Sequence, residues 1–143
     1  MALTYRYREQ PGKKGARTKT PSIPVLFMGG SPTRFQVVAL VDSGADCSVL
    51  PRGLAEILNV DLSGPQQDSF GFGGKIICIQ SKVSLLLSQG HEKVHLEIPI
   101  LVSPDDNCPP ILGRAGFFDV FRVTFDSKNH HLTLKKNGNG PSY

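Results

Sequence analysis

The sequence predicts an all-β fold, and three observations lead to this expectation. Short apolar segments with a period of two recur along the chain, turn-forming residues separate them, and one short segment has helical spacing. The chain has 143 residues, which is enough for one domain that buries a core without disulfide bridges. We therefore expect one domain of short strands with one or two short helices.

The first two expected strands span residues 23–28 and 34–41 and enclose a turn rich in glycine and proline at residues 29–33. This pattern is typical of a hairpin, whose second strand leads directly to Asp42. Residues 42–44 read Asp-Ser-Gly, so a carboxylate follows an apolar strand on a tight turn where Gly44 lets other backbone come close. A carboxylate fixed in this way suits acid–base catalysis of peptide hydrolysis.

The next expected element is a short helix at Pro51–Leu58, because apolar side chains at helical spacing follow a proline. Residues 70–74 contain three glycines and are followed by a β-branched run at residues 75–79, which predicts the tip and second arm of a hairpin.

Two later segments also alternate between apolar and polar residues. Residues 94–102 predict a half-buried strand, in which Pro99 indicates a sheet edge or a bulge. Residues 121–125 and 131–135 flank a polar turn at residues 126–129, so we expect a C-terminal hairpin.

Three motifs follow one another in the order Asp42-Ser43-Gly44, Phe70–Gly74 and Pro109–Arg114, the last reading Pro-Pro-Ile-Leu-Gly-Arg. Together they resemble the retropepsin-like aspartic proteases, the single-domain relatives of retroviral proteases and of pepsin, over about residues 23–125. The resemblance implies a closed barrel of short strands with a flap hairpin and a C-terminal hairpin.

The same resemblance implies an aspartic endopeptidase that acts on extended peptide segments. Peptide hydrolysis by aspartates uses two carboxylates that share a proton, and the sequence contains a single Asp-Ser-Gly triplet. A two-fold homodimer would supply the second carboxylate from Asp42 of another copy. The alternative from a different functional class is a non-catalytic module that binds peptides or proteins with the same fold.

The resemblance also implies a role for each matching residue. Asp42 would be catalytic, and the residues that support the active site would be Ser43, Gly44, Asp46 and Arg114. Substrate would contact Ala45, Cys47, Gly71, Phe72 and Gly73, the last three as part of the flap. Three simpler interpretations remain open: an ordinary surface ion pair between Asp46 and Arg114, a flexible turn at residues 70–74, and a Cys47 that serves only the core.

The formal net charge is +4, and six basic residues lie before residue 20. We expect a basic, flexible N-terminal tail at residues 1–22, a protease-like domain at residues 23–136, and a flexible C-terminus at residues 137–143. The basic tail also suits nucleic acid or an acidic partner, but no aromatic residues or known binding motif support that function. We expect peptide or protein substrates as partners and no nucleic acid.

No cofactor and no metal are expected. His91 and His95 have the spacing of metal ligands on a helix, but they lie in a segment that is predicted to be a turn and a strand. Three cysteines, Cys47, Cys78 and Cys108, leave one unpaired in any disulfide scheme, which favours a reducing compartment. Without an apolar segment long enough for a membrane span, we expect a soluble cytoplasmic protein.

Overall fold

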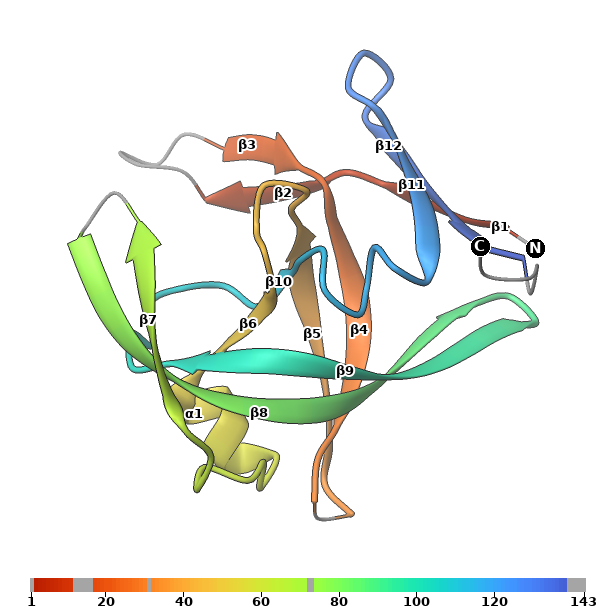
Figure 1. Cartoon of the computed structure of the whole chain (residues 1–143). Helices are drawn as coiled ribbons and strands as arrows, with labels where there is room; N and C mark the ends of the chain where they lie inside the picture. Colours follow the sequence, from red (N-terminus) through yellow and green to blue (C-terminus); the bar gives the residue numbers. More distant parts are fainter. Residues whose placement is uncertain (1, 12–16, 31, 72–73, 139–143) are drawn as a thin grey trace.

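The computed structural model describes residues 2–11, 17–30, 32–71 and 74–138, in which strands predominate (Figure 1). The strands and the single helix of this part of the chain are β1 (Ala2–Arg6), β2 (Arg8–Pro11), β3 (Arg17–Thr20), β4 (Ser22–Met28), β5 (Arg34–Val41), β6 (Ser48–Pro51), α1 (Arg52–Ile57), β7 (Gln66–Gly71), β8 (Gly74–Gln89), β9 (Glu92–Ser103), β10 (Ile111–Leu112), β11 (Phe121–Asp126) and β12 (His131–Lys136). The predicted all-β class is confirmed.

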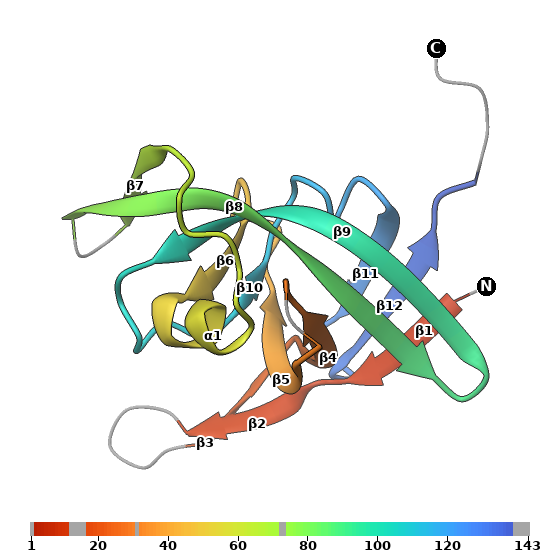
Figure 2. The same cartoon turned by 90° about the horizontal axis from the view of Figure 1, so that it is seen from below.

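The main sheet has seven strands in the order β4-β5-β10-β6-β9-β8-β7. The sheet curves until β4 also pairs with β8, through the pairs Leu26↔Leu86, Phe27↔Leu85 and Met28↔Ser84. Figure 2 shows β8 and β9 crossing the whole molecule as one long curved ribbon. Because β7 continues beyond this closure, the sheet is curved and meets itself at one corner. It is not the closed barrel that the resemblance implied.

The predicted first hairpin is present as β4 and β5, which pair over seven residues. Its inward side chains follow the period of two, since Ile23, Val25 and Phe27 are at most 1% exposed. On β5, the inward residues Ala39 and Val41 lead to Asp42 at the end of the strand. The packing of this hairpin in the core therefore fixes where the Asp-Ser-Gly turn begins.

The predicted helix after the Asp-Ser-Gly turn is present as α1, which begins directly after Pro51 at the end of β6. It buries Leu54 and Ala55, and Leu58 lies just beyond its last turn with no exposed surface. This apolar side explains why so short a helix is stable: it covers the sheet beside β6 and β9.

The predicted strand at residues 94–102 is part of β9. It pairs with β8 along its length, whereas its parallel pairing with β6 begins at Ile100, one residue after Pro99. Proline has no N–H group to donate to a neighbouring strand. Pro99 lies just before the part of β9 that pairs with β6, so it is at the edge of that pairing, which agrees with the predicted edge position.

The N-terminal stretch differs from the flexible tail that we expected at residues 1–22. Strand β1 pairs with β12 over five residues, and Leu3 and Tyr5 are buried in the core. The alternation of Leu3 and Tyr5 with exposed neighbours matches the alternation of Leu132 and Leu134 on β12. The free energy gained by burying these two apolar side chains is therefore enough to order the strand, although basic residues follow it.

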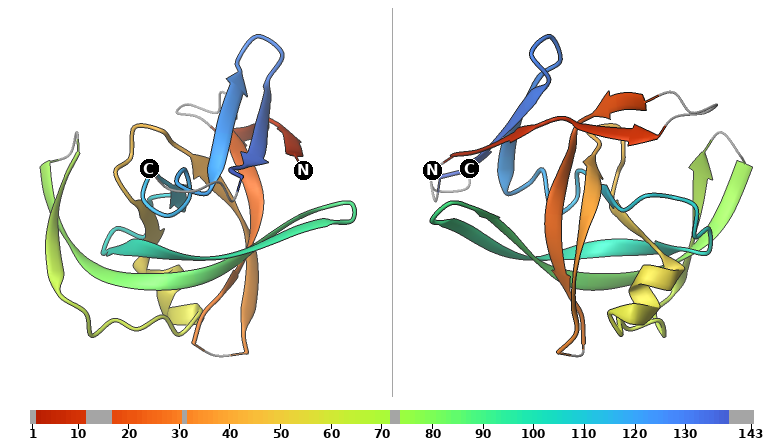
Figure 3. Two further views of the ribbon diagram at one scale, coloured as in Figure 1. Left: turned by 45° about the vertical axis from the view of Figure 1, so that its right-hand side comes forward. Right: turned by 180° about the vertical axis from the view of Figure 1, so that it is seen from behind.

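The predicted C-terminal hairpin is present as β11 and β12, and with β1 it forms a three-stranded sheet. Figure 3 shows this sheet standing apart from the β7–β8 hairpin, at the other side of the molecule. The expected C-terminal tail begins at Asn137, whose N–H donates to the carbonyl of Val120 at 2.8 Å, and residues 139–143 lie outside the described residues. In the described part of the chain, no helix has the length and apolar character needed to cross a membrane.

Candidate active site

Asp42 follows β5 at a point where hydrogen bonds hold the backbone from both sides. The N–H of Val41 donates to the carbonyl of Pro21 at 2.9 Å, and the N–H of Asp42 donates to the carbonyl of Leu112 at 3.0 Å. Strand β10 runs parallel to the end of β5, with Leu112 opposite Val41. The strand end that carries Asp42 is therefore a rigid part of the sheet.

The carboxylate of Asp42 folds back over its own turn. Its Oδ1 accepts the N–H of Gly44 at 2.9 Å, and the N–H of Ala45 donates to the carbonyl of Asp42 at 3.2 Å. A Cβ atom at Gly44 would lie 3.2 Å from Oδ1 of Asp42, which is closer than ordinary contact. A larger residue here would push the Asp42 carboxylate by a few tenths of an ångström, and the turn leaves Ser43 and Gly44 exposed.

The loop after Asp42 crosses the segment after β10 at close range. The N–H groups of Arg114 and Ala115 donate to the carbonyls of Ala45 and Asp46 at 2.9 and 3.0 Å. At Gly113 a Cβ atom would lie 2.4 Å from the carbonyl oxygen of Cys47, so only glycine fits between the two segments. The Leu-Gly-Arg part of the third motif therefore lies directly against the Asp-Ser-Gly turn.

The side chain of Arg114 joins two points of this loop. Its Nη2 donates to Oδ1 of Asp46, and its Nη1 donates to the carbonyl of Ser43 at 3.2 Å. The side chains of Arg114 and Asp46 are 54% and 88% exposed, so this ion pair contributes little to global stability. Instead, the two hydrogen bonds of Arg114 connect Ser43 with Asp46, the first and last residues of the segment 43–46.

Cys47 lies next along the loop and is half-buried. Burial raises the pKa of its thiol, and the nearby carboxylate of Asp46 raises it further. A thiol that stays protonated at neutral pH is a poor nucleophile, so the environment argues against cysteine chemistry at this site. Instead of serving only the core, Cys47 also lines a cavity.

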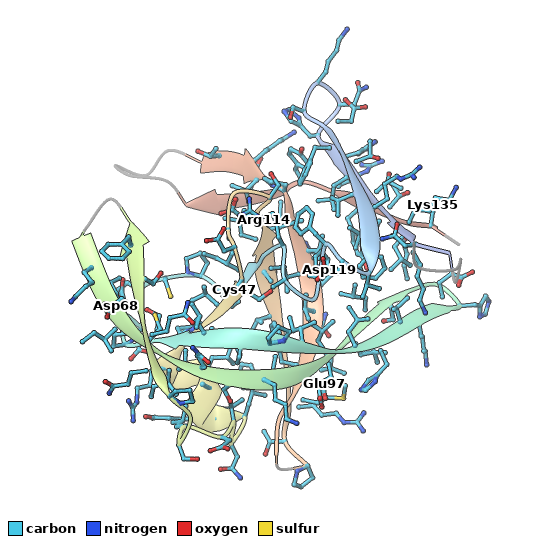
Figure 4. All side chains as sticks on the ribbon, viewed as in Figure 1. Cys47, Asp68, Glu97, Arg114, Asp119 and Lys135 are labelled. Carbon is cyan, nitrogen blue, oxygen red and sulfur yellow. The ribbon has the colours of Figure 1, made fainter. Side chains whose placement is uncertain are left out.

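That cavity, of about 600 Å³, lies between the Asp42 loop and the β7–β8 hairpin. Its lining combines carboxylates and other polar groups with an apolar floor and is formed by Asp42, Gly44, Ala45, Asp46, Cys47, Val49, Gln67, Asp68, Ser69, Phe70, Leu101 and Ile111. Figure 4 shows Cys47 and Arg114 near the centre of the molecule and Asp68 on the hairpin at the left. An elongated peptide side chain or backbone segment fits a space of this size.

The glycine-rich tip at residues 70–74 joins β7 to β8, as the sequence predicts for a hairpin. Gly71 is paired with Gly74 at the end of the ladder, whereas Phe72 and Gly73 lie outside the described residues. Phe70, next to the tip, is 78% exposed and lines the cavity.

A second cavity, of about 510 Å³, also includes Asp42 in its lining. Its lining residues come from the N-terminal segment, the Asp-Ser-Gly turn and the β11–β12 hairpin: Tyr7, Lys19, Pro21, Val41, Asp42, Ser43, Phe125, Ser127 and His130. A third cavity, of about 590 Å³ beside Asn59–Ser63, includes no residue of the Asp42 loop. Asp42 thus borders two cavities.

Comparisons with solved structures find proteins with a similar overall fold. One similar structure is EIAV protease complexed with the inhibitor HBY-793, which is 27% identical, covers 67% of this chain and 83% of the viral chain, and gives a TM-score of 0.50. Another is a retropepsin-like aspartic protease from Rickettsia conorii, which is 14% identical, covers 94% of this chain and 98% of the other, and gives a TM-score of 0.59.

The fold is retropepsin-like. No protein-family model matches the sequence, and no curated protein matches it. Within the retropepsin-like fold, the Asp42 loop and the β7–β8 hairpin meet around one cavity. Backbone hydrogen bonds hold the Leu-Gly-Arg segment against the Asp42 loop, although about 70 residues separate the two in the sequence.

Sequence reasoning missed part of this retropepsin-like site. Gln67 and Ser69 line the first cavity, but their position depends on the pairing of β7 with β8. Tyr7, Lys19 and His130 line the second cavity, and they come from opposite ends of the chain. The one available signal was the alternation of Leu3 and Tyr5, which marks β1 as a strand and thereby brings the N-terminal segment to the body of the molecule.

Proposed function

We propose that the protein is an aspartic endopeptidase that hydrolyses extended peptide segments. The observation that carries the proposal is the position of Asp42, at the end of a buried strand and at the edge of a cavity of about 600 Å³ beneath a glycine-tipped hairpin. A peptide in extended conformation would lie in this cavity as an added strand, with its side chains in pockets to either side.

The proposed chemistry uses two carboxylates, each from Asp42 of one copy in a homodimer. One, ionised, takes a proton from a water molecule as the water oxygen attacks the scissile carbonyl carbon, and the other, protonated, donates its proton to the carbonyl oxygen. Collapse of the tetrahedral intermediate then passes a proton to the leaving nitrogen. Two adjacent carboxylates do not both ionise readily, so we expect activity to favour mildly acidic conditions.

The neighbours of Asp42 would have supporting roles. The hydroxyl of Ser43 is exposed and free to join a hydrogen-bond network with its copy beneath the two carboxylates. Gly44 lets the substrate backbone approach, and the contacts of Arg114 with Asp46 and Ser43 keep the loop in one shape.

The cavity lining would bind the peptide. Ala45 and Cys47 present small side chains beside the catalytic group. The hairpin tip with Gly71, Phe72 and Gly73 would act as a flap that closes over the substrate, excludes water and offers backbone hydrogen bonds.

Two further expectations belong to this proposal. The peptidase domain would include β1, since its side chains complete the core. The free thiols of the three cysteines suit a reducing compartment, and we propose a soluble cytoplasmic enzyme on that basis.

The direct test is cleavage of an unbiased peptide mixture by the purified full-length chain, from about pH 3 to pH 8, with products identified by mass spectrometry. We expect cleavage that is strongest at mildly acidic pH and is lost in Asp42→Asn. An unchanged rate in Asp42→Asn would contradict the proposal. Absence of cleavage by the folded wild-type chain would favour a peptide- or protein-binding module that uses the same cavity.

A further inference from the structure

Strand β8 has a gap along one of its two edges. On one side it pairs continuously with β9. On the other side it pairs with β7 as far as Ile79 and with β4 from Ser84 onward. Just after the first of these pairings, the N–H of Gln80 donates to the carbonyl of Pro65, in the loop before β7, at 2.9 Å. The gap therefore begins after Gln80 and ends at Ser84.

Lys82 presents its backbone to this gap. In an antiparallel strand, the N–H and C=O groups of every second residue point to the same side. Because Gln80 donates away from β9, Lys82 also faces away from β9, where it lies opposite Pro99. Among the described residues, neither a strand pairing nor a loop hydrogen bond satisfies these two groups of Lys82. The gap therefore offers one donor and one acceptor in strand geometry.

The gap opens into the third cavity, of about 590 Å³, whose lining includes Lys82. One wall is the end of β4 with the glycines after it, and the other is the loop at Asn59–Ser63. The hydroxyl of Ser81 ties this loop to β8, since it donates to the carbonyl of Asp61 at 2.6 Å. The two walls also touch, because a Cβ atom at Gly29 would collide with the carbonyl oxygen of Leu58. The cavity is thus enclosed by parts of the fold that hold one another in place.

The lining combines an apolar floor with an acidic rim. Val60 and Val83 form part of the floor and are 6% and 3% exposed. On the rim, Lys82 and Glu97 form an exposed pair at 3.7 Å, so Asp61 is the carboxylate that has no cation among the lining residues. Hydrogen bonds from a serine hydroxyl and N–H in its own turn lower the pKa of Asp61, so this carboxylate is ionised at neutral pH. A long aliphatic side chain with a positive end complements such a surface.

The third cavity is separate from the cavity beside Asp42, with which it shares no lining residue. Figure 4 shows Glu97 at the lower edge of the β8–β9 ribbon, whereas Cys47 and Arg114 lie above the ribbon. A ligand in the third cavity therefore leaves the cavity beside Asp42 open.

We propose that the third cavity is a second peptide site, which binds one basic residue of an extended peptide segment. The N–H and C=O of Lys82 bond the backbone of that residue as in an antiparallel strand pair, and its side chain lies over the floor with its charged end at Asp61. Since Gln80 and Ser84 already have partners, a single residue pairs in the gap. The inference concerns binding alone and does not rest on the proposed function. In a peptidase, this site would hold a protein substrate at a second point.

The test is an NMR titration of the isotope-labelled full-length chain with N-acetyl-arginine N-methylamide. This probe carries a single residue with its own N–H, C=O and charged side chain. We expect saturable shifts of the amide signals at Lys82 and at residues 59–63. In the free chain, the Lys82 amide should exchange its hydrogen faster than the amides of Gln80 and Ser84, which have partners, and the probe should slow this exchange.

Two substitutions at one position separate the backbone of Lys82 from its side chain. Lys82→Pro removes the N–H that faces the gap, so it should weaken binding at least about tenfold. Lys82→Ala keeps this N–H and should change binding less than about threefold. Circular dichroism should show that both chains are folded, because a proline is tolerated where the N–H of a strand has no partner. If the proline variant does not fold, the hydrogen exchange of Lys82 in the wild-type chain, with and without the probe, decides the question.

The charge of Asp61 is tested in the same titration. Asp61→Asn should weaken binding at least about fivefold, because the carboxylate that faces the arginine is neutralised. The matched control is Asp126→Asn in the turn after β11, since both aspartates accept hydrogen bonds within their own turns. This control should leave binding unchanged. N-acetyl-leucine N-methylamide, which keeps the backbone of the probe without its charge, should bind more weakly to the wild-type chain.

Three results would overturn the second peptide site. These are the absence of saturable shifts around the third cavity, equal binding of the probe by the wild-type and Lys82→Pro chains, and equal effects of Asp61→Asn and Asp126→Asn. None of them affects the proposed function, which is tested by cleavage and by Asp42→Asn. Conversely, a chain that binds the probe at Lys82 but shows no cleavage dependent on Asp42 would overturn the proposed function and leave the second peptide site.

Discussion

The guanidinium of Arg114 bonds the carboxylate of Asp46 and the carbonyl of Ser43 at the same time, across 68 and 71 residues of sequence. An ordinary surface ion pair would involve the two charged groups alone. The additional bond to a backbone carbonyl next to Asp42 links the arginine to the position of the proposed catalytic group. The two contacts suggest that Arg114 matters for activity more than for stability.

Arg114→Ala should lower peptide cleavage roughly tenfold to a hundredfold, because small misplacements of a catalytic group cost that much. The free energy of unfolding should fall by only about 0–1 kcal/mol, since both side chains are exposed. Cleavage assays and urea unfolding on the same preparation measure the two effects.

The matched control is Arg52→Ala, which removes the exposed ion pair between Arg52 and Glu56 on α1. It should change stability by a similar small amount and leave cleavage unchanged. If both variants cleaved peptides like the wild type, Arg114 would be an ordinary surface residue.

Ser48 joins the end of the Asp42 loop to the segment after β10 through a buried hydrogen bond. Its hydroxyl is the acceptor for the N–H of Gly113 at 3.0 Å, and the serine is 1% exposed. Ser48→Ala leaves this buried N–H without its partner, so we expect unfolding to become easier by about 1–3 kcal/mol. Urea unfolding measures the change, with the exposed Ser88→Ala as the neutral control. A loss as small as that of the control would show that the bond is not needed.

The thiol of Cys47 should titrate above its ordinary value, because burial and the charge of Asp46 both raise its pKa from 9.0. The rate of its alkylation by iodoacetamide, followed peptide by peptide with mass spectrometry, gives the midpoint. We expect the midpoint to move down in Asp46→Asn, since a negative charge that disfavours the thiolate is removed. A midpoint below the ordinary value in the wild-type chain would instead indicate an activated cysteine.

Tyr5 is buried with a hydroxyl that has no hydrogen-bond partner among the described residues. Burial raises its pKa above 10.0 in the folded chain, so above that pH the unfolded chain loses this proton first. The free energy of unfolding should therefore fall as the pH rises past about 10, and Tyr5→Phe should remove part of this slope.

At neutral pH, Tyr5→Phe should leave stability unchanged or raise it by up to about 1 kcal/mol, because an unpaired buried polar group is removed. Urea unfolding of both chains from about pH 7 to pH 11 measures this difference and the alkaline slope. Identical slopes would mean that the hydroxyl reaches solvent or a partner when folded.

Local patterns were sufficient to predict the elements around Asp42. The alternation in β4, β5 and β9, the proline at the start of α1 and the glycines after β7 each depend on a few neighbouring residues. Because the three motifs lie at the ends of such elements, the meeting of Asp42, Arg114 and the β7–β8 hairpin was also predictable from the resemblance.

Long-range pairing was not predictable in the same way. Strand β1 is stabilised by β12, about 130 residues away, and its few apolar residues come just before the basic residues Arg6 and Arg8. Strand β8 extends over 16 residues through the polar stretch Gln80-Ser81-Lys82, because β9 pairs with it there. The second cavity beside Asp42 is lined by residues from the N-terminal segment and from the β11–β12 hairpin, which the pairing of β1 with β12 brings together, so the sequence pattern near Asp42 did not reveal it.

The central claim is that one active site contains Asp42 from two copies, and mixing wild-type chains with Asp42→Asn chains tests it most directly. At constant total concentration and after exchange of subunits, the peptide-cleavage rate should fall as the square of the wild-type fraction, because only dimers with two carboxylates are active. A rate that falls in direct proportion to the wild-type fraction would contradict the claim, since each chain would then carry a complete site of its own.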